Sequence, residues 1–133
     1  MRIGFFPNMG KSTIMAVLKM AAHICREEQI EVYLPDDLER PDTYKVLQIP
    51  KENVLPRLEI FKHIDVAFSF GGDGTIIHLA RQIFSYNIPV CGINLGELGF
   101  LNQIEVHQLQ SHIKRIAQGD YTIEKRGHLH AYI

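Results

Sequence analysis

The stretch Phe68-Ser-Phe-Gly-Gly-Asp-Gly-Thr75 joins an apolar run to a glycine-rich turn and then to a helical pattern. The run begins at Ile64, and apolar residues recur at helical spacing from Ile76 to Phe84. A strand, a glycine turn and a helix start in this order form an anion site, because the first amides of a helix lack partners within it. Glycines also let phosphate oxygens approach the main chain. The stretch therefore predicts a phosphate-binding turn made by Gly71, Gly72, Gly74 and Thr75.

Asp73 is a single carboxylate set inside this turn. Phosphate would repel it unless it holds a metal ion or takes a proton, so its position points to phosphoryl chemistry as well as to binding. The other interpretation is that Asp73 caps the following helix by accepting its first amide hydrogen bonds. Such a cap needs one Asp and no flanking glycines, which favours phosphate binding. His78 lies in the first turn of the same helix and is a candidate phosphate contact.

Apolar strands alternate with amphipathic helices on both sides of the turn. Strands are expected at 2–6, 30–34, 64–70 and 88–93, and helices at about 12–28, after Thr75 and at 105–117. Continuous apolar strands between helices predict a parallel sheet covered on both faces. The expected fold is α/β, a three-layer, Rossmann-like nucleotide-binding domain. In such folds ligands bind at the carboxyl ends of the strands.

The last residues of the chain differ in pattern from the rest. Residues 1–119 carry the α/β alternation, whereas 120–133 have strand character that stops without a turn or a return strand. A lone strand does not form a stable layer by itself. We therefore expect 1–119 to be the α/β domain and 120–133 to be the first strand of a second, β-rich domain.

Two further loops follow expected strands. Gly92-Ile-Asn-Leu-Gly-Glu-Leu-Gly-Phe-Leu101 partly matches a dinucleotide fingerprint, but Asn94 replaces its first glycine. It displays Phe100, a ring that could pack on a base or fill the core. Asn8-Met-Gly-Lys-Ser-Thr13 is similar to the end of a P-loop but lacks its first glycine. Lys11 remains a candidate point charge for a phosphate oxygen.

Composition excludes several classes of function. The net charge of −1 over 133 residues gives no electrostatic reason to expect a nucleic acid or a membrane as partner. Neither a membrane-spanning stretch nor a signal peptide is recognisable, so a cytoplasmic location is expected. Cys25 and Cys91 are isolated and are expected to be buried, reduced thiols. The seven histidines show no metal-ligand spacing, so no metal site made of protein side chains is expected.

At Gly71–Gly74 and Asn94–Leu101 the sequence resembles the NAD kinases, whose N-terminal domains carry Gly-Gly-Asp-Gly and Asn-x-Gly-x-Leu-Gly-Phe-Leu. The turn with Asn8 and Lys11 and the segment Gly119–Arg126 are also similar to that family. Gly-Gly-Asp-Gly alone is shared with diacylglycerol kinases, sphingosine kinases and 6-phosphofructokinases. The second loop is what singles out the NAD kinases.

The resemblance implies phosphorylation of the adenosine 2′-hydroxyl of NAD by ATP, giving NADP. It implies that Asp73 is the general base, that Mg²⁺ or another divalent cation accompanies ATP, and that Phe100 lines the adenosine pocket. Polyphosphate as a donor stays open. The nucleotide-binding residues expected on this basis are Lys11, Gly71, Gly72, Asp73, Gly74, Thr75, His78, Asn94 and Phe100.

The family continues into a β-rich domain that holds part of the NAD, and its members form homo-oligomers. On this resemblance the 133-residue chain alone is expected to have little or no activity. Two alternatives stay open. One is a lipid or sugar kinase with the same glycine turn, and the other is a nucleotide-binding module without catalysis.

Overall fold

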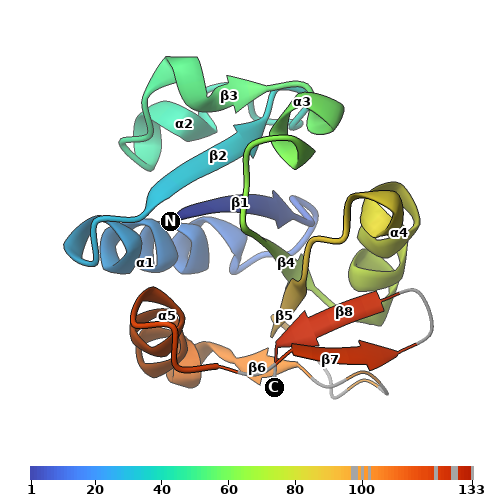
Figure 1. Cartoon of the computed structure of the whole chain (residues 1–133). Helices are drawn as coiled ribbons and strands as arrows, with labels where there is room; N and C mark the ends of the chain where they lie inside the picture. Colours follow the sequence, from blue (N-terminus) through green and yellow to red (C-terminus); the bar gives the residue numbers. More distant parts are fainter. Residues whose placement is uncertain (97–98, 100, 102, 122, 127–128, 133) are drawn as a thin grey trace.

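The computed structural model describes residues 1–96, 99, 101, 103–121, 123–126 and 129–132, and it has three layers (Figure 1). The strands are β1 (Arg2–Pro7), β2 (Glu31–Pro35), β3 (Val54–Leu55), β4 (Val66–Gly71), β5 (Val90–Asn94), β6 (Ile104–Glu105), β7 (Ile123–Arg126) and β8 (Leu129–Tyr132). The helices are α1 (Ile14–Glu27), α2 (Thr43–Val46), α3 (Arg57–Phe61), α4 (Asp73–Ile83) and α5 (Leu109–Ala117). None of the described helices is long and apolar enough to cross a membrane.

The strands β3, β2, β1, β4 and β5 lie in that order and are all parallel, and β6 pairs in parallel with the carboxyl end of β5. The chain runs outward from β1 to β3 and then returns to the other side of β1 at β4. The strand order therefore reverses between β1 and β4. In open α/β sheets this reversal leaves a crevice outside the carboxyl ends of the strands. The α/β fold expected from the sequence is confirmed.

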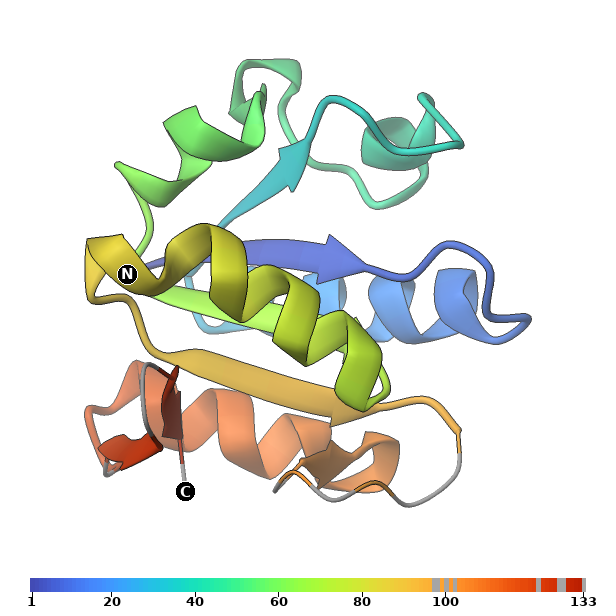
Figure 2. The same cartoon turned by 90° about the vertical axis from the view of Figure 1, so that its right-hand side faces the viewer.

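Alternation along the strands divides the core into two clusters. Phe5, Phe68 and Phe70 pack with α1 and α5, and the ring of Phe5 lies 5.0 Å from that of Phe70 between centroids. Phe6 and Ala67, one residue out of step, pack with α3 and α4. Side chains of successive strand residues point to opposite faces, so each strand contributes to both clusters. Figure 2 shows α4 in front of the sheet, with α1 and α5 behind it.

The tail differs from the sequence expectation. In place of a single strand, β7 and β8 form an antiparallel pair, and β8 joins the sheet beside β5, where Ala131 is opposite Val90. The reason lies in backbone hydrogen bonding: an unpaired strand leaves its amides and carbonyls without partners, and β6 covers β5 only at Ile93 and Asn94. The expectation of one lone strand is therefore wrong. The assignment of 120–133 to a second domain stays a prediction.

Candidate functional site

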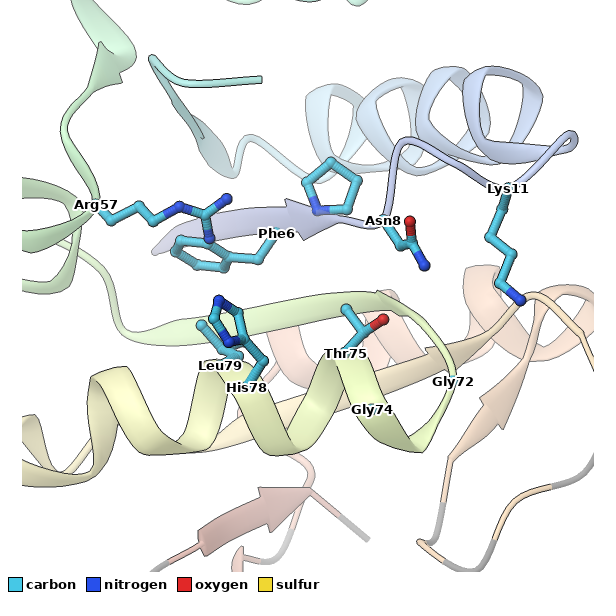
Figure 3. A pocket seen from close by; sticks show the side chains of 10 residues that line it. Phe6, Asn8, Lys11, Arg57, Gly72, Gly74, Thr75, His78 and Leu79 are labelled. Atoms are coloured by element: carbon cyan, nitrogen blue, oxygen red, sulfur yellow. The ribbon is translucent and has the colours of Figure 1, made fainter. Parts of the chain in front are cut away.

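A cavity of about 450 Å³ opens at the carboxyl ends of β1 and β4, where the strand order reverses (Figure 3). Three segments far apart in the sequence meet there: the turn after β1, the start of α3 and the first two turns of α4. The lining residues are Phe6, Pro7, Asn8, Lys11, Arg57, Gly72, Gly74, Thr75, His78 and Leu79. The cavity thus lies where ligands bind in open α/β sheets, at the carboxyl ends of the strands beside the reversal of strand order.

The ionisable side chains among the described residues that line this cavity are basic. Arg57 and His78 lie at one end and Lys11 at the other, with Asn8 and Thr75 between them (Figure 3). Among the described residues that line it there is no Asp or Glu. The amino end of α4, the positive end of the helix dipole, adds to the same potential. The cavity therefore favours an anion, and its donors match the oxygens of phosphate.

The glycines of the turn have two different roles. A Cβ added to Gly71 would collide with Thr75 Oγ1, so Gly71 is needed for packing between β4 and α4. A Cβ added to Gly72 or Gly74 would meet no atom within 4 Å in the part of the chain that the structure describes. Gly72 has φ −121° and ψ −162°, extended values that other residues adopt. The described fold therefore does not require glycine at these two positions. A ligand that approaches the main chain closely would require it, because a Cβ would stand in its way.

Asp73 does not cap α4. The N-cap position belongs to Gly72, and Asp73 is the first residue of the helix. Its Oδ1 accepts hydrogen bonds from the Leu101 amide over 3.2 Å and from Gln103 Nε2 over 2.8 Å. A Cβ added to Gly99 would lie 2.6 Å from Asp73 Oδ2. The second glycine-rich loop thus packs directly onto the carboxylate, and the capping interpretation is wrong.

Both loops at this edge are folded by an asparagine. Asn8 Oδ1 accepts from the Gly10 amide and Asn94 Oδ1 from the Gly96 amide, each over 3.0 Å. Such side-chain turns fix the chain as it leaves a strand. A Cβ added to Gly96 would lie 3.7 Å from Lys11 Nζ, which places the ammonium of the first loop against the second.

The structure brings together five of the residues that the sequence predicts for nucleotide binding: Lys11, Gly72, Gly74, Thr75 and His78. Gly71 and Asp73 adjoin them in the same turn. Asn94 instead lines a separate cavity of about 660 Å³ beside α1, on the opposite face of the sheet. Phe100 lies outside the described residues.

Arg57 is the cavity residue that the sequence analysis missed. It is the first residue of α3, directly after Pro56, and its Nε lies 3.1 Å from Asp37 Oδ2. Its guanidinium stands 5.8 Å from the centroid of the Phe6 ring. One sequence signal was available, because a helix start at Arg57 follows the end of β3 after the single residue Pro56. The same order of strand end and helix start occurs around Gly72. A two-residue strand is too short to show a pattern, so that signal was not recognised.

Comparison with known proteins identifies the family. A family model described as the ATP-NAD kinase N-terminal domain matches residues 3–121. The chain belongs to the NAD kinase family. It is 33% identical to an NAD kinase of Natranaerobius thermophilus over 98% of this chain, and 34% identical to one of a Marinomonas species over 99%. These alignments cover 44% and 43% of the relatives, so the chain spans less than half of their length.

A solved structure supports the same fold for this NAD kinase family member. Yeast NADH kinase, crystallised in complex with NADH, superposes with a TM-score of 0.70 at 18% sequence identity. The superposition covers 94% of this chain and 40% of the yeast chain. At that identity the likeness shows the fold and no more.

The described part of this NAD kinase domain holds no group of three or more His, Cys, Asp or Glu residues that could bind a metal ion. The donors around the cavity are cations, amides and a hydroxyl, a set that suits phosphate oxygens better than a bare cation. A divalent ion would therefore fit this site as part of a nucleotide, carried on its phosphates.

The two thiols are expected to be inert at neutral pH. Burial raises the pKa of both Cys25 and Cys91 to about 12, with nearby Arg26 lowering that of Cys25 slightly. Because only the thiolate reacts, native protein at pH 8 should resist iodoacetamide for hours, while protein in 6 M guanidinium should take up two labels. Mass spectrometry counts the labels, and rapid native labelling would contradict the burial.

The same pKa values set an alkaline limit on stability. The folded state holds both thiol protons up to about pH 12, whereas unfolded thiols release them near 9. The cysteine contribution to the free energy of unfolding is therefore complete below pH 9 and falls as the pH rises toward 12. The slope is about 1.4 kcal/mol per pH unit for each thiol.

Proposed function

We propose that this chain carries the ATP-phosphate site and the proton acceptor of an NAD kinase. The reaction transfers the γ-phosphoryl group of ATP to the adenosine 2′-hydroxyl of NAD and yields NADP and ADP. The observation that supports it is the cavity at the β1–β4 reversal. There a glycine turn with open space in front of Gly72 and Gly74 faces Lys11, Arg57 and His78.

Phosphoryl transfer needs charge neutralisation and positioning more than covalent help from the protein. In the proposed complex, amides at Gly72, Gly74 and Thr75 and the Lys11 ammonium bind phosphate oxygens. Arg57 and His78 hold the far end of the triphosphate of ATP. Mg²⁺ or another divalent cation, brought in on the phosphates of ATP, would offset their negative charge.

The proposed base is Asp73. The 2′-hydroxyl oxygen attacks the γ-phosphorus, its proton passes to the Asp73 carboxylate, and the β–γ bridging oxygen leaves with ADP. Hydrogen bonds from Leu101 and Gln103 hold one carboxylate oxygen in place. A held carboxylate has fewer orientations to lose when the substrate arrives, which supports a catalytic role.

NAD as acceptor is supported by family membership, and the yeast NADH kinase is a relative in fold that was crystallised with NADH. The relatives in sequence are more than twice as long as this chain. On the basis of family membership we also propose that a second, β-rich domain makes part of the NAD contacts and that the protein forms homo-oligomers. Low activity of the 133 residues alone and a cytoplasmic location are proposed on the same basis.

An assay of NADP formation tests the proposal. The natural gene product is incubated with NAD and Mg-ATP, and NADP is measured with an NADP-specific dehydrogenase. Reactions without ATP, with polyphosphate as donor, and with diacylglycerol or fructose 6-phosphate as acceptor define the specificity. NADP formation that depends on ATP is expected. ATP binding without transfer to any acceptor would support the module without catalysis instead.

The basic groups of the cavity give a further prediction on the 133-residue chain. Lys11→Met and Arg57→Met should each raise the Kd of Mg-ATP about tenfold, because each removes a charge-assisted hydrogen bond. Arg40→Met is the matched control, since Arg40 is exposed and lies outside the cavity. Calorimetry measures all three. Equal affinities for the wild type and both cavity variants would place ATP elsewhere.

A further inference from the structure

Gln103 forms a hydrogen bond with Asp73, although the two residues lie thirty positions apart in the sequence. Its Nε2 donates to Asp73 Oδ1 over 2.8 Å, and the Leu101 amide donates to the same oxygen. A carboxylate accepts hydrogen bonds, so the nitrogen of the Gln103 amide must face Asp73 and its oxygen must face away. Gln103 does not line the phosphate cavity.

The other half of this amide has an energetic cost. Gln103 Oε1 is buried and has no hydrogen-bond partner among the described residues. A buried acceptor without a partner lowers stability, and an apolar side chain of the same shape would avoid that loss. The one hydrogen bond found for the Gln103 side chain in the described structure is the bond to Asp73. Any functional role of the Gln103 side chain is therefore expected to act through the Asp73 carboxylate.

Packing holds the Gln103 side chain in this orientation. A Cβ added to Gly92 would lie 3.0 Å from Gln103 Cγ, so the stem of Gln103 fills the space beside β5. In the same loop, Gly99 packs so closely against Asp73 that an added Cβ would lie 2.6 Å from Asp73 Oδ2. A side chain fixed along its stem loses little further freedom when its amide holds a partner.

We propose that Gln103 is a positioning residue that orients the Asp73 carboxylate for proton transfer. This inference rests on the proposed function of Asp73. Because Gln103 touches the base and lies outside the phosphate cavity, its loss should lower kcat and leave the KM of ATP and of NAD nearly unchanged. Because its Oε1 lacks a partner, the same loss should not lower thermal stability.

The test uses Gln103→Met in the natural gene product, a change that keeps the length of the side chain and removes the amide. We expect kcat to fall about 10- to 100-fold, both KM values to stay within about twofold, and Tm to stay level or rise. Gln82→Met controls for stability. Within the described residues Gln82 Oε1 is likewise buried without a hydrogen-bond partner, but the Gln82 amide nitrogen contacts His78 and not Asp73. Gln103→Glu is a second variant of the same shape, and its carboxylate should repel that of Asp73 and lower kcat at least as much.

A double-mutant cycle with Asp73→Asn separates positioning from a structural role. If Gln103 acts through the carboxylate, Gln103→Met should change the residual rate of Asp73→Asn by less than about twofold. An equal loss in both backgrounds, or wild-type kcat in both Gln103 variants, would overturn the inference. Full activity of Asp73→Asn alone would instead overturn the proposed function, so the two failures are distinguishable.

Discussion

Asp73→Asn in the natural gene product should lower kcat about a thousandfold, within the range contributed by a general base. Asparagine keeps the shape of the side chain and an oxygen that can accept from Leu101 and Gln103. It cannot take the proton of the 2′-hydroxyl. Because Asp73 does not line the phosphate cavity, the Kd of Mg-ATP should stay within about threefold. Initial rates of NADP formation and calorimetry measure the two quantities.

The matched control is Asp65→Asn, the same change at the opposite end of β4. Asp65 is exposed and accepts from the Arg2 amide, remote from the cavity. It should leave both kcat and ATP affinity at wild-type values. If Asp73→Asn keeps wild-type kcat, Asp73 is not the base. If ATP affinity falls in parallel with kcat, Asp73 acts on the donor nucleotide instead.

Gly74→Ala should abolish most ATP binding without harming the fold, and it carries the second largest expected effect. The added methyl group meets no atom of the described residues within 4 Å, and alanine is favoured over glycine in a helix by about 1 kcal/mol. Tm should therefore stay level or rise. The methyl group would stand where phosphate oxygens approach the main chain, so the Kd of Mg-ATP should rise at least about tenfold.

Gly71→Ala provides the contrast within the same turn. Its Cβ would collide with Thr75, so this variant should lose about 1–3 kcal/mol of stability through overpacking. Thermal melts and calorimetry on both variants separate the glycine that the fold needs from the glycine that the ligand needs. Unchanged ATP affinity in a well-folded Gly74→Ala chain would contradict the proposed phosphate contact.

The long elements could be predicted from sequence because each carries its own pattern. The strands expected at 2–6 and 64–70 correspond to β1 and β4, whose residues are almost all buried, as continuous apolar runs require. The two-residue strands β3 and β6 could not be predicted, because they exist only through pairing with β2 and β5. The pairing of β7 with β8 was missed because alternation alone does not show where a strand turns back.

The candidate site was predictable where it depends on one turn and not where it depends on packing. Lys11, Gly72 and His78 follow from the rule that ligands bind at the carboxyl ends of parallel strands. Arg57 enters the cavity because α3 packs beside Phe6, a contact between segments fifty residues apart in the sequence. Gln103 reads as an ordinary polar loop residue until the loop is folded onto Asp73. Long-range placement of this kind leaves no local signal.

The most direct measurement is a map of amide chemical shifts in the ¹⁵N-labelled 133-residue chain as Mg-ATP is added. The largest changes should fall on Lys11, Gly72, Gly74 and Thr75, with smaller ones at Arg57 and His78. Changes centred on the cavity beside α1, at Val17, Met20 and Val106, would contradict the proposed phosphate site. So would a spectrum that stays unchanged at millimolar Mg-ATP.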